Sequence, residues 1–336
     1  MNAEAGPSAV MMAVTDLARA AEQASLVRLA LSSGLLAHAA EAVTVADLAA
    51  AVNAPREPVA AVCTALVALG ALHREGTRVR LSTTWKPLVE GGLDVLLERT
   101  LQGAAARQDL IEGSLAQPAT YWAGGGTRRR ALAESVTLPP ATEFGRAVTQ
   151  GLIAGIPGLD ELLASGARWL ELGCGVAGNA LATAYLYPNV HVVGVDIAAD
   201  LLDVARASAR QLGVSDRVQF VECDAGSYTD DKLFDIVFWS QFFFPAATRK
   251  AALDNALARL RPGGLLLCPV LPGDRESPES GSPQAQQAAL EAIIYRQWDV
   301  PVLSDDELAK EVTGAGFTDT RVHRLDFATV MTAFRP

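Results

Sequence analysis

Three carboxylates stand where short apolar runs end, and they are the first residues whose type and spacing could do chemistry. Glu171 lies near the end of the run 169–172. Asp196 closes the run 191–196, and Asp224 closes the run after it. Side chains at the carboxyl ends of parallel strands face one crevice. Acids there would repel a pyrophosphate, so they favour a ligand with ribose hydroxyls and an ammonium or sulfonium group.

Glycines must position the first of these acids. Gly173, Gly175 and Gly178 follow it directly. They let the backbone turn sharply out of a strand and approach a ligand without an intervening Cβ. The helical pattern of 179–187 then presents free N–H groups at its start. A G-x-G-x-x-G motif alone is weak, so its surroundings decide what it binds.

Further runs complete an alternation of strands and helices. The runs 234–239 and 265–271 predict two more buried strands. Five motifs then follow one another in order: Glu171–Gly178, Gly194–Ile197, Cys223–Ala225, Phe234–Val237 and Leu260–Gly264.

These motifs resemble those of the class I S-adenosylmethionine-dependent methyltransferases, over roughly residues 167–336. The resemblance implies an α/β fold with a doubly wound, Rossmann-like, seven-stranded sheet. It also implies S-adenosyl-L-methionine as the cofactor, with its methionine part over the first two glycines, its amino group near the first acid and its ribose on the second. The implied cofactor-binding residues are Glu171, Gly173, Gly175, Asp196, Ile197, Asp224, Ala225, Ser240 and Arg146.

Composition limits the function classes. The 336 residues suffice for two domains, and the net charge of −10 argues against nucleic acid or an anionic membrane as the main partner. No apolar run approaches the ~20 residues of a membrane span. The four cysteines show no metal-ligand spacing, so we expect no metal site and a reducing, cytoplasmic location.

The N-terminal region, residues 1–91, reads as helix, turn, helix and hairpin, which predicts an α-helical winged-helix domain. Its second helix, 57–69, is almost wholly apolar, and only Arg56 and Glu57 at its start could contact a base edge. The segment resembles the N-terminal dimerisation domain of small-molecule O-methyltransferases of bacteria and plants. That resemblance implies a homodimer, and it is favoured over the alternative of DNA binding.

A helical connector is predicted over residues 92–165, before a cofactor domain at 166–336. A long helix is expected at 142–163, although glycines and Pro157 weaken its middle. In the resembled family this connector lies over the cofactor and the acceptor. Arg146 could therefore contact the cofactor's carboxylate, or it is a plain surface arginine.

The segment that follows the fourth predicted strand is expected to lie beside the acceptor. Aromatic residues are scarce in this chain, yet four fall within the six residues 239–244. They either pack the rim of the sheet or form a desolvated aromatic wall that attracts a sulfonium. The expected substrate-pocket residues are Tyr121, Trp239, Gln241, Phe242, Phe243, Tyr295 and Trp298.

The same segment departs from the resembled family. Many relatives carry a His–Asp pair there, and the histidine deprotonates a phenol, whereas this chain has Phe and Pro. The four histidines, at 38, 73, 191 and 323, fall elsewhere in the sequence. The catalytic residues therefore stay unknown, and Tyr121, Tyr295 and Asp299 are the candidates for proton handling. Proximity and orientation would serve a nucleophile that is already ionised or unprotonated.

The leading hypothesis is a dimeric enzyme that methylates a small metabolite, in secondary metabolism, without a histidine base. The alternative is a cyclase on the same fold, for instance one in which the cofactor's amine displaces its own thioether and releases methylthioadenosine. A winged-helix DNA-binding regulator is the third hypothesis.

Overall fold

The computed structural model describes residues 7–89, 93–115, 126–270, 281–326 and 328–336. The chain forms two compact units, residues 1–102 and 103–336. The boundary falls within helix α5 (Leu93–Glu112). The predicted division at residues 91 and 165, with its functional roles, stays a prediction.

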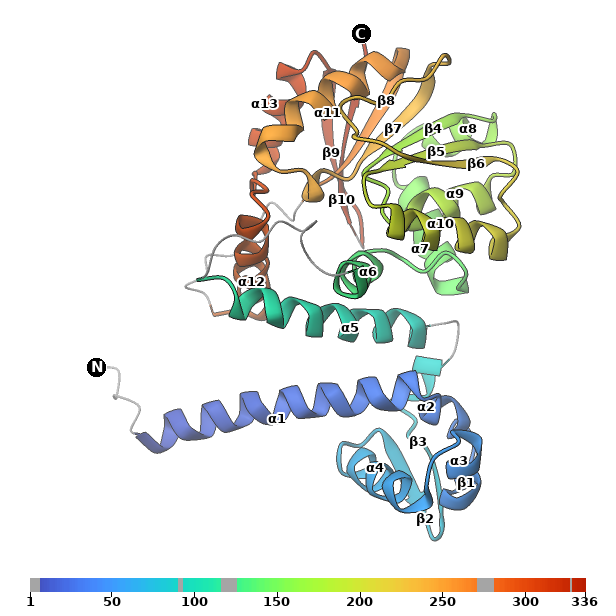
Figure 1. Ribbon diagram of the computed structural model, residues 1–336, viewed down its shortest axis with the longest axis vertical. Helices are drawn as coiled ribbons and strands as arrows, with labels where there is room; N and C mark the ends of the chain where they lie inside the picture. Colours follow the sequence, from blue (N-terminus) through green and yellow to red (C-terminus); the bar gives the residue numbers. More distant parts are fainter. Residues whose placement is uncertain (1–6, 90–92, 116–125, 271–280, 327) are drawn as a thin grey trace. The chain divides into compact units, whose positions relative to one another are not determined.

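The N-terminal unit is built as the pattern of helix, turn, helix and hairpin predicts (Figure 1). Its strands pair in the order β1-β3-β2, all antiparallel. The Thr44 side chain accepts a hydrogen bond from the Asp47 N–H and so caps α3. Its elements are α1 (Pro7–Ser32), α2 (Leu35–His38), β1 (Val43–Thr44), α3 (Val45–Ala51), α4 (Arg56–Ala68), β2 (Leu72–Glu75), β3 (Arg78–Leu81) and the 3-10 turn η1 (Lys86–Val89).

The C-terminal unit holds a seven-stranded sheet in the order β6-β5-β4-β7-β8-β10-β9. The first five strands in this order are parallel, and β10 is antiparallel to both of its neighbours. This is the predicted doubly wound sheet. Its strands are β4 (Arg168–Leu172), β5 (His191–Asp196), β6 (Val218–Glu222), β7 (Phe234–Trp239), β8 (Leu260–Val270), β9 (Thr318–Arg324) and β10 (Thr329–Phe334).

Helices cover both faces of this sheet (Figure 1). On one face α8, α9 and α10 pack in a core with Trp169 and Ile236, and on the other α11 and α13 pack with Leu170 and Val237. Successive residues of a strand point to opposite faces, which explains this alternation. The unit's helices are α6 (Gly126–Ser135), α7 (Glu143–Ala154), α8 (Leu159–Ala164), α9 (Gly178–Leu186), α10 (Ala199–Leu212), η3 (Gln241–Phe243), α11 (Ala246–Arg259), α12 (Pro283–Gln297) and α13 (Asp305–Gly314).

The prediction of one long helix at 142–163 was wrong, because the structure has two helices there, α7 and α8. Pro157 cannot donate the backbone hydrogen bond that a continuous helix needs there. Gly158 adopts a left-handed conformation (φ 78°) and is the N-cap residue of α8. The glycines and the proline therefore break the helix rather than merely weakening it.

Within the described residues, no helix is long and apolar enough to cross a membrane.

Candidate functional site

The turn after β4 is held in a conformation that glycine favours. Gly173 has φ 72° and Gly175 has φ 52°. The Gly173 N–H donates to the Val195 carbonyl on the neighbouring strand at 2.9 Å. A Cβ on Gly173 would lie 2.7 Å from Cε2 of Phe244, so the ring of Phe244 takes the space that a side chain would need. This turn leaves no room for another residue type.

Gly178, the first residue of α9, meets the segment that connects α6 to α7. A Cβ on Gly178 would lie 1.9 Å from Cγ2 of Thr137 and 2.8 Å from the carbonyl oxygen of Leu138. The third glycine of the motif therefore permits close packing of the connector.

Glu171 is buried beside this turn, with 3% of its surface exposed. Its Oε2 atom is buried and has no hydrogen-bond partner in the part of the chain that the structure describes. Burial raises the pKa of its carboxyl group to about 8; a backbone hydrogen bond from Ala180 offsets a part of this shift. A buried carboxylate without a counter-charge favours either a proton or a cationic ligand.

Asp196, at the end of β5, is 5% exposed and supports the glycine turn directly. Its Oδ2 accepts the Gly175 N–H at 2.7 Å, and its Oδ1 accepts the Ala198 N–H at 2.9 Å. Burial raises the pKa of this carboxyl group, while these two backbone donors act in the opposite direction. Asp196 therefore joins the two loops that follow β4 and β5.

The residues predicted to contact an adenine lie at the rim. Ile197 is 45% exposed, which is unusual for a large apolar side chain that follows a buried strand. Asp224 is exposed, and its Oδ1 accepts the Gly226 N–H at 2.8 Å. Ala225 beside it is buried. Parallel pairing sets Glu171 opposite Gly194 and Asp196 opposite Glu222, so the three acids follow adjacent strands at one edge of the sheet.

Helix α6 covers the loops that follow β4 and β5. Ala133 packs with Val176 of the glycine turn and with Ala198. Arg129 forms an ion pair with Asp200, with Nη2 and Oδ1 2.7 Å apart. Arg129 belongs to a run of three arginines, 128–130, and only the tertiary structure reveals this pairing.

The aromatic segment after β7 is divided between two clusters. Trp239 and Phe244 are buried in the core of the sheet, with their rings edge to face at a centroid distance of 5.7 Å. Phe242 and Phe243 instead pair with Tyr295 (5.9 Å) and Trp298 (6.0 Å) of the α12 region. Trp239 and Phe244 therefore pack in the core, whereas a role of Phe242 and Phe243 as a wall toward the cofactor stays a prediction.

Ser240 and Gln241 connect these two clusters. The Ser240 N–H donates to the Leu172 carbonyl at 3.1 Å, which holds the segment beside the end of β4. Gln241 is 3% exposed, and its Nε2 donates to the Pro269 carbonyl at 3.0 Å.

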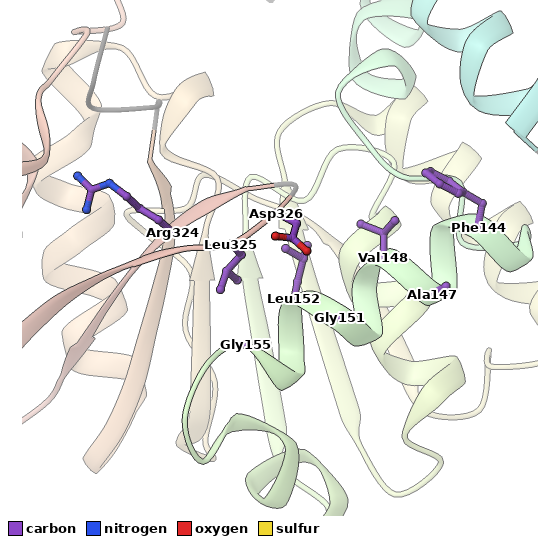
Figure 2. A pocket seen from close by; sticks show the side chains of 9 residues that line it. All are labelled: Phe144, Ala147, Val148, Gly151, Leu152, Gly155, Arg324, Leu325 and Asp326. Atoms are coloured by element: carbon purple, nitrogen blue, oxygen red, sulfur yellow. The ribbon is translucent and has the colours of Figure 1, made fainter.

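A cavity of about 470 Å³ lies between α7 and the turn that joins β9 to β10 (Figure 2). In Figure 2 the carboxylate of Asp326 lies over Leu152, while the side chain of Arg324 extends away from α7. The walls are mostly apolar. A Cβ on Gly151 would meet nothing within 4 Å, whereas one on Gly155 would lie 2.6 Å from Cδ2 of Leu325. The lining residues are Phe144, Ala147, Val148, Gly151, Leu152, Gly155, Arg324, Leu325 and Asp326.

The remaining predicted residues lie as follows. Arg146 donates to the carbonyls of Pro140 and Ala141, and its guanidinium lies over the ring of Tyr185 at 4.9 Å. Its predicted role toward a cofactor stays a prediction. Tyr121 lies outside the described residues. Asp299 is exposed, and its carbonyl accepts the Ala246 N–H at 2.8 Å.

The histidines are placed on both units. His38 is in α2, His73 in β2, and His191 begins β5. His323 in β9 shares a hydrogen bond with the Thr332 hydroxyl at 3.0 Å, and burial lowers its pKa. Among the residues that the structure describes, no group of three or more His, Cys, Asp or Glu side chains could hold a metal ion.

The chain matches the family model described as a methyltransferase domain over residues 170–264. The release factor glutamine methyltransferase of Chlorobaculum tepidum is 35% identical over 105 residues. The aligned stretch is 30% of this chain and 35% of that protein, so the chain spans about a third of the length of this relative.

Two solved structures resemble almost the whole chain. An O-methyltransferase family protein from Burkholderia thailandensis has a TM-score of 0.73 at 17% identity, covering 97% of this chain and 98% of that one. Human N-acetylserotonin methyltransferase in complex with SAM has a TM-score of 0.69 at 16% identity, covering 100% and 99%. At such low identity these likenesses show the fold.

The matched domain and the fold define a class I S-adenosylmethionine-dependent methyltransferase domain. The predicted class, an S-adenosylmethionine-dependent transferase, is confirmed, and so is S-adenosyl-L-methionine as its cofactor. Within that class, the fold is the one seen in small-molecule O-methyltransferases.

The buried carboxyl group of Glu171 predicts a pH dependence of stability without ligand. Its pKa in the folded chain, about 8, lies above the ordinary value. The neutral carboxyl group therefore makes its full contribution to the free energy of unfolding at low pH. This contribution, on the order of a few kcal/mol, is lost as the pH rises toward 8. Glu171→Gln should remove this dependence. Denaturant titrations at pH 5.5 and 8.5 measure it, and an equal difference between variant and wild type at both values would contradict it.

Two glycines of α7 predict opposite effects of one substitution. A Cβ on Gly151 meets nothing within 4 Å, so Gly151→Ala should stabilise the unit by about 0.5–1 kcal/mol. A Cβ on Gly145 would lie 2.2 Å from the Pro139 carbonyl oxygen, so Gly145→Ala should destabilise it by about 1–3 kcal/mol. Thermal unfolding measures the midpoints of the two variants. Equal midpoints would contradict the packing of α7 described above.

Proposed function

We propose that this chain transfers the methyl group of S-adenosylmethionine to a small-molecule acceptor without a histidine as general base. The observation that supports this most is the buried Glu171 carboxyl group at the glycine turn, whose Oε2 has no partner. An ammonium group supplies the positive charge that such a carboxylate needs. The site thus fits the amino acid part of this cofactor.

The other residues of the site fit the remaining parts. Asp196 stands at the end of β5 with its carboxylate fixed by two backbone donors, where ribose hydroxyls would meet it. The exposed Ile197 offers an apolar surface to an adenine ring. When bound, the cofactor supplies a methyl group on positively charged sulfur, and the electron pair of the broken C–S bond stays on the sulfur.

The chain's own contribution to the reaction is orientation. Ser240 fixes the aromatic segment against β4, and Phe244 occupies the space over Gly173. No histidine occurs between residues 239 and 298, so the acceptor must arrive ionised or unprotonated, as a carboxylate, thiolate, amine or stabilised carbanion. Holding such a nucleophile in line with the methyl group accelerates transfer without a base.

Methyl transfer predicts one nucleoside product. Purified chain incubated with S-adenosylmethionine and a panel of small acceptors should release S-adenosylhomocysteine, and Asp196→Ala should weaken cofactor uptake at least about tenfold, because it removes the ribose partner. Mass spectrometry of the nucleosides and calorimetry measure these outcomes. Methylthioadenosine formed without any acceptor would instead support the cyclase, and no uptake of cofactor would refute both.

We further propose that the chain forms a homodimer through its N-terminal unit. Helix α1 exposes six large apolar side chains, each more than half exposed: Val10, Met11, Met12, Val14, Leu17 and Leu29. Exposed apolar side chains in this number are stabilised when another chain covers them. The apolar composition of α4 supports this function over DNA reading.

Light scattering should give twice the mass of one chain, and Met11→Glu with Leu17→Glu should give a single chain. Leu115→Glu, at a side chain that is 99% exposed in the other unit, is the matched control and should leave the mass unchanged. A monomeric wild type that shifts DNA at low salt would favour the regulator instead.

A further inference from the structure

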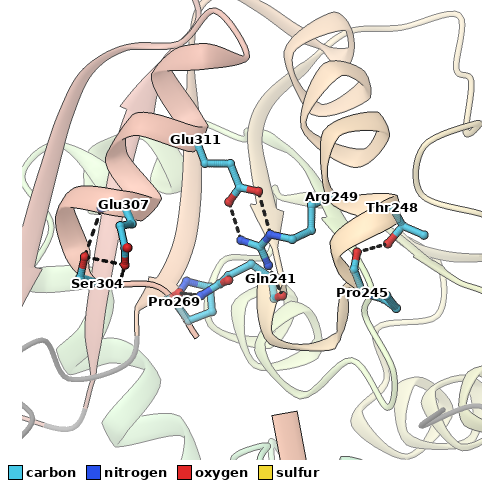
Figure 3. A network of polar contacts seen from close by, with 8 residues as sticks. All are labelled: Gln241, Pro245, Thr248, Arg249, Pro269, Ser304, Glu307 and Glu311. Carbon is cyan, nitrogen blue, oxygen red and sulfur yellow. Dashed lines mark hydrogen bonds and ion pairs between the residues drawn. The ribbon is translucent and has the colours of Figure 1, made fainter. Parts of the chain in front are cut away.

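A buried arginine holds the segment that follows β7. Arg249 of α11 is 1% exposed. Its Nη1 donates to the Gln241 carbonyl at 2.9 Å (Figure 3). Its guanidinium also lies over the Trp239 ring, 4.7 Å from the ring centroid. One cation therefore fixes both the last residue of β7 and the first residue of η3.

Helix α13 supplies the counter-charge. Nε and Nη2 of Arg249 donate to the two carboxylate oxygens of Glu311 at 2.8 and 2.6 Å (Figure 3). Such a two-point pair fixes the plane of the guanidinium as well as its position. A buried guanidinium without this partner would be strongly destabilising.

The fixed segment reaches both the cofactor side and the acceptor side. Gln241 is tied to the end of β8 through the Pro269 carbonyl. The Cβ of Ser240 lies 3.6 Å from the position a Cβ would take on Gly173, and Phe242 and Phe243 carry the rings that pair with Tyr295 and Trp298. A shift of η3 would therefore move the wall of the site as a whole.

The pairing of Arg249 with Glu311 also affects the electrostatic interaction with a cationic ligand. A sulfonium is a cation, and an unbalanced guanidinium at the end of β7 would repel it through a medium of low polarity. The neutral thioether of S-adenosylhomocysteine would not be repelled in this way. The bidentate carboxylate leaves the pair with no net charge.

We propose that Arg249 is a positioning residue for the transfer site: it fixes residues 240–244 against Trp239, and Glu311 cancels its charge toward a cationic ligand. The second part rests on the proposed function. The first part stands on the contacts of the chain alone.

Two substitutions separate the two parts. Glu311→Gln keeps the size of the side chain but leaves the guanidinium unbalanced, whereas Arg249→Lys keeps the charge but loses the planar two-point contact. Glu307→Gln is the matched control, because it lies on the same helix and its carboxylate accepts hydrogen bonds from the N–H and the hydroxyl group of Ser304 in the capping box.

Calorimetry with S-adenosylmethionine and with S-adenosylhomocysteine tests the charge. In Glu311→Gln the ratio of the two dissociation constants should shift about threefold to tenfold against the cation. Arg249→Lys and Glu307→Gln should keep the ratio of the wild type. An unchanged ratio in Glu311→Gln would overturn this part, while a wild type that binds neither nucleoside would refute the cofactor assignment instead.

Hydrogen exchange of a peptide covering 240–246 tests the positioning without any ligand. The N–H groups of Phe243 and Phe244 donate to Ser240 and Gln241, so their exchange should accelerate at least about tenfold in Arg249→Lys and stay at the wild-type rate in Glu307→Gln. Equal exchange in the wild type and Arg249→Lys would overturn the positioning role. If Glu311→Gln fails to fold, Arg249→Lys still decides this point.

Discussion

The burial of one carboxyl group constrains the rest of this site. Glu171 lies near the end of β4, beside a turn in which Gly173 and Gly175 have positive φ, and its Oε2 has no hydrogen-bond partner among the described residues. Such a group is costly to bury as an anion, so the free protein raises its pKa and a cationic ligand can replace the proton. The neighbouring acid differs, because the carboxylate of Asp196 is satisfied by two backbone donors and holds the loops together.

Around Glu171 and Asp196, neighbouring elements cover the loops that follow β4 and β5 in different ways. On one side α6 packs on Val176 and Ala198 and is fixed by the ion pair of Arg129 with Asp200. On the other side, the segment after β7 is held by Arg249. The ion pairs of Arg129 with Asp200 and of Arg249 with Glu311 each join residues far apart in the sequence. The carboxyl edge of the sheet is thus flanked by two segments that ion pairs keep in place.

The fold was largely predictable because its determinants are local. Apolar runs and glycine turns act over a few residues, and the runs 169–172 and 191–196 lie in strands β4 and β5 of the structure. The break between α7 and α8 was missed, since the weight of Pro157 and Gly158 against a long apolar pattern depends on what the helix packs against. The division of the aromatic segment between two ring clusters also depends on how the helices pack, so the sequence did not predict it.

The sequence by itself determined the class of this protein, because the glycine turn and the acids near the ends of apolar runs are local features set by residue type. From them the sequence also predicts where a positively charged nucleoside would bind. Only the tertiary structure decided which side chains close the site. Arg249 reaches Glu311 across 62 positions, and Arg129 reaches Asp200 across 71. Pairing between buried or half-buried charges depends on how helices pack, and no short-range pattern encodes that packing.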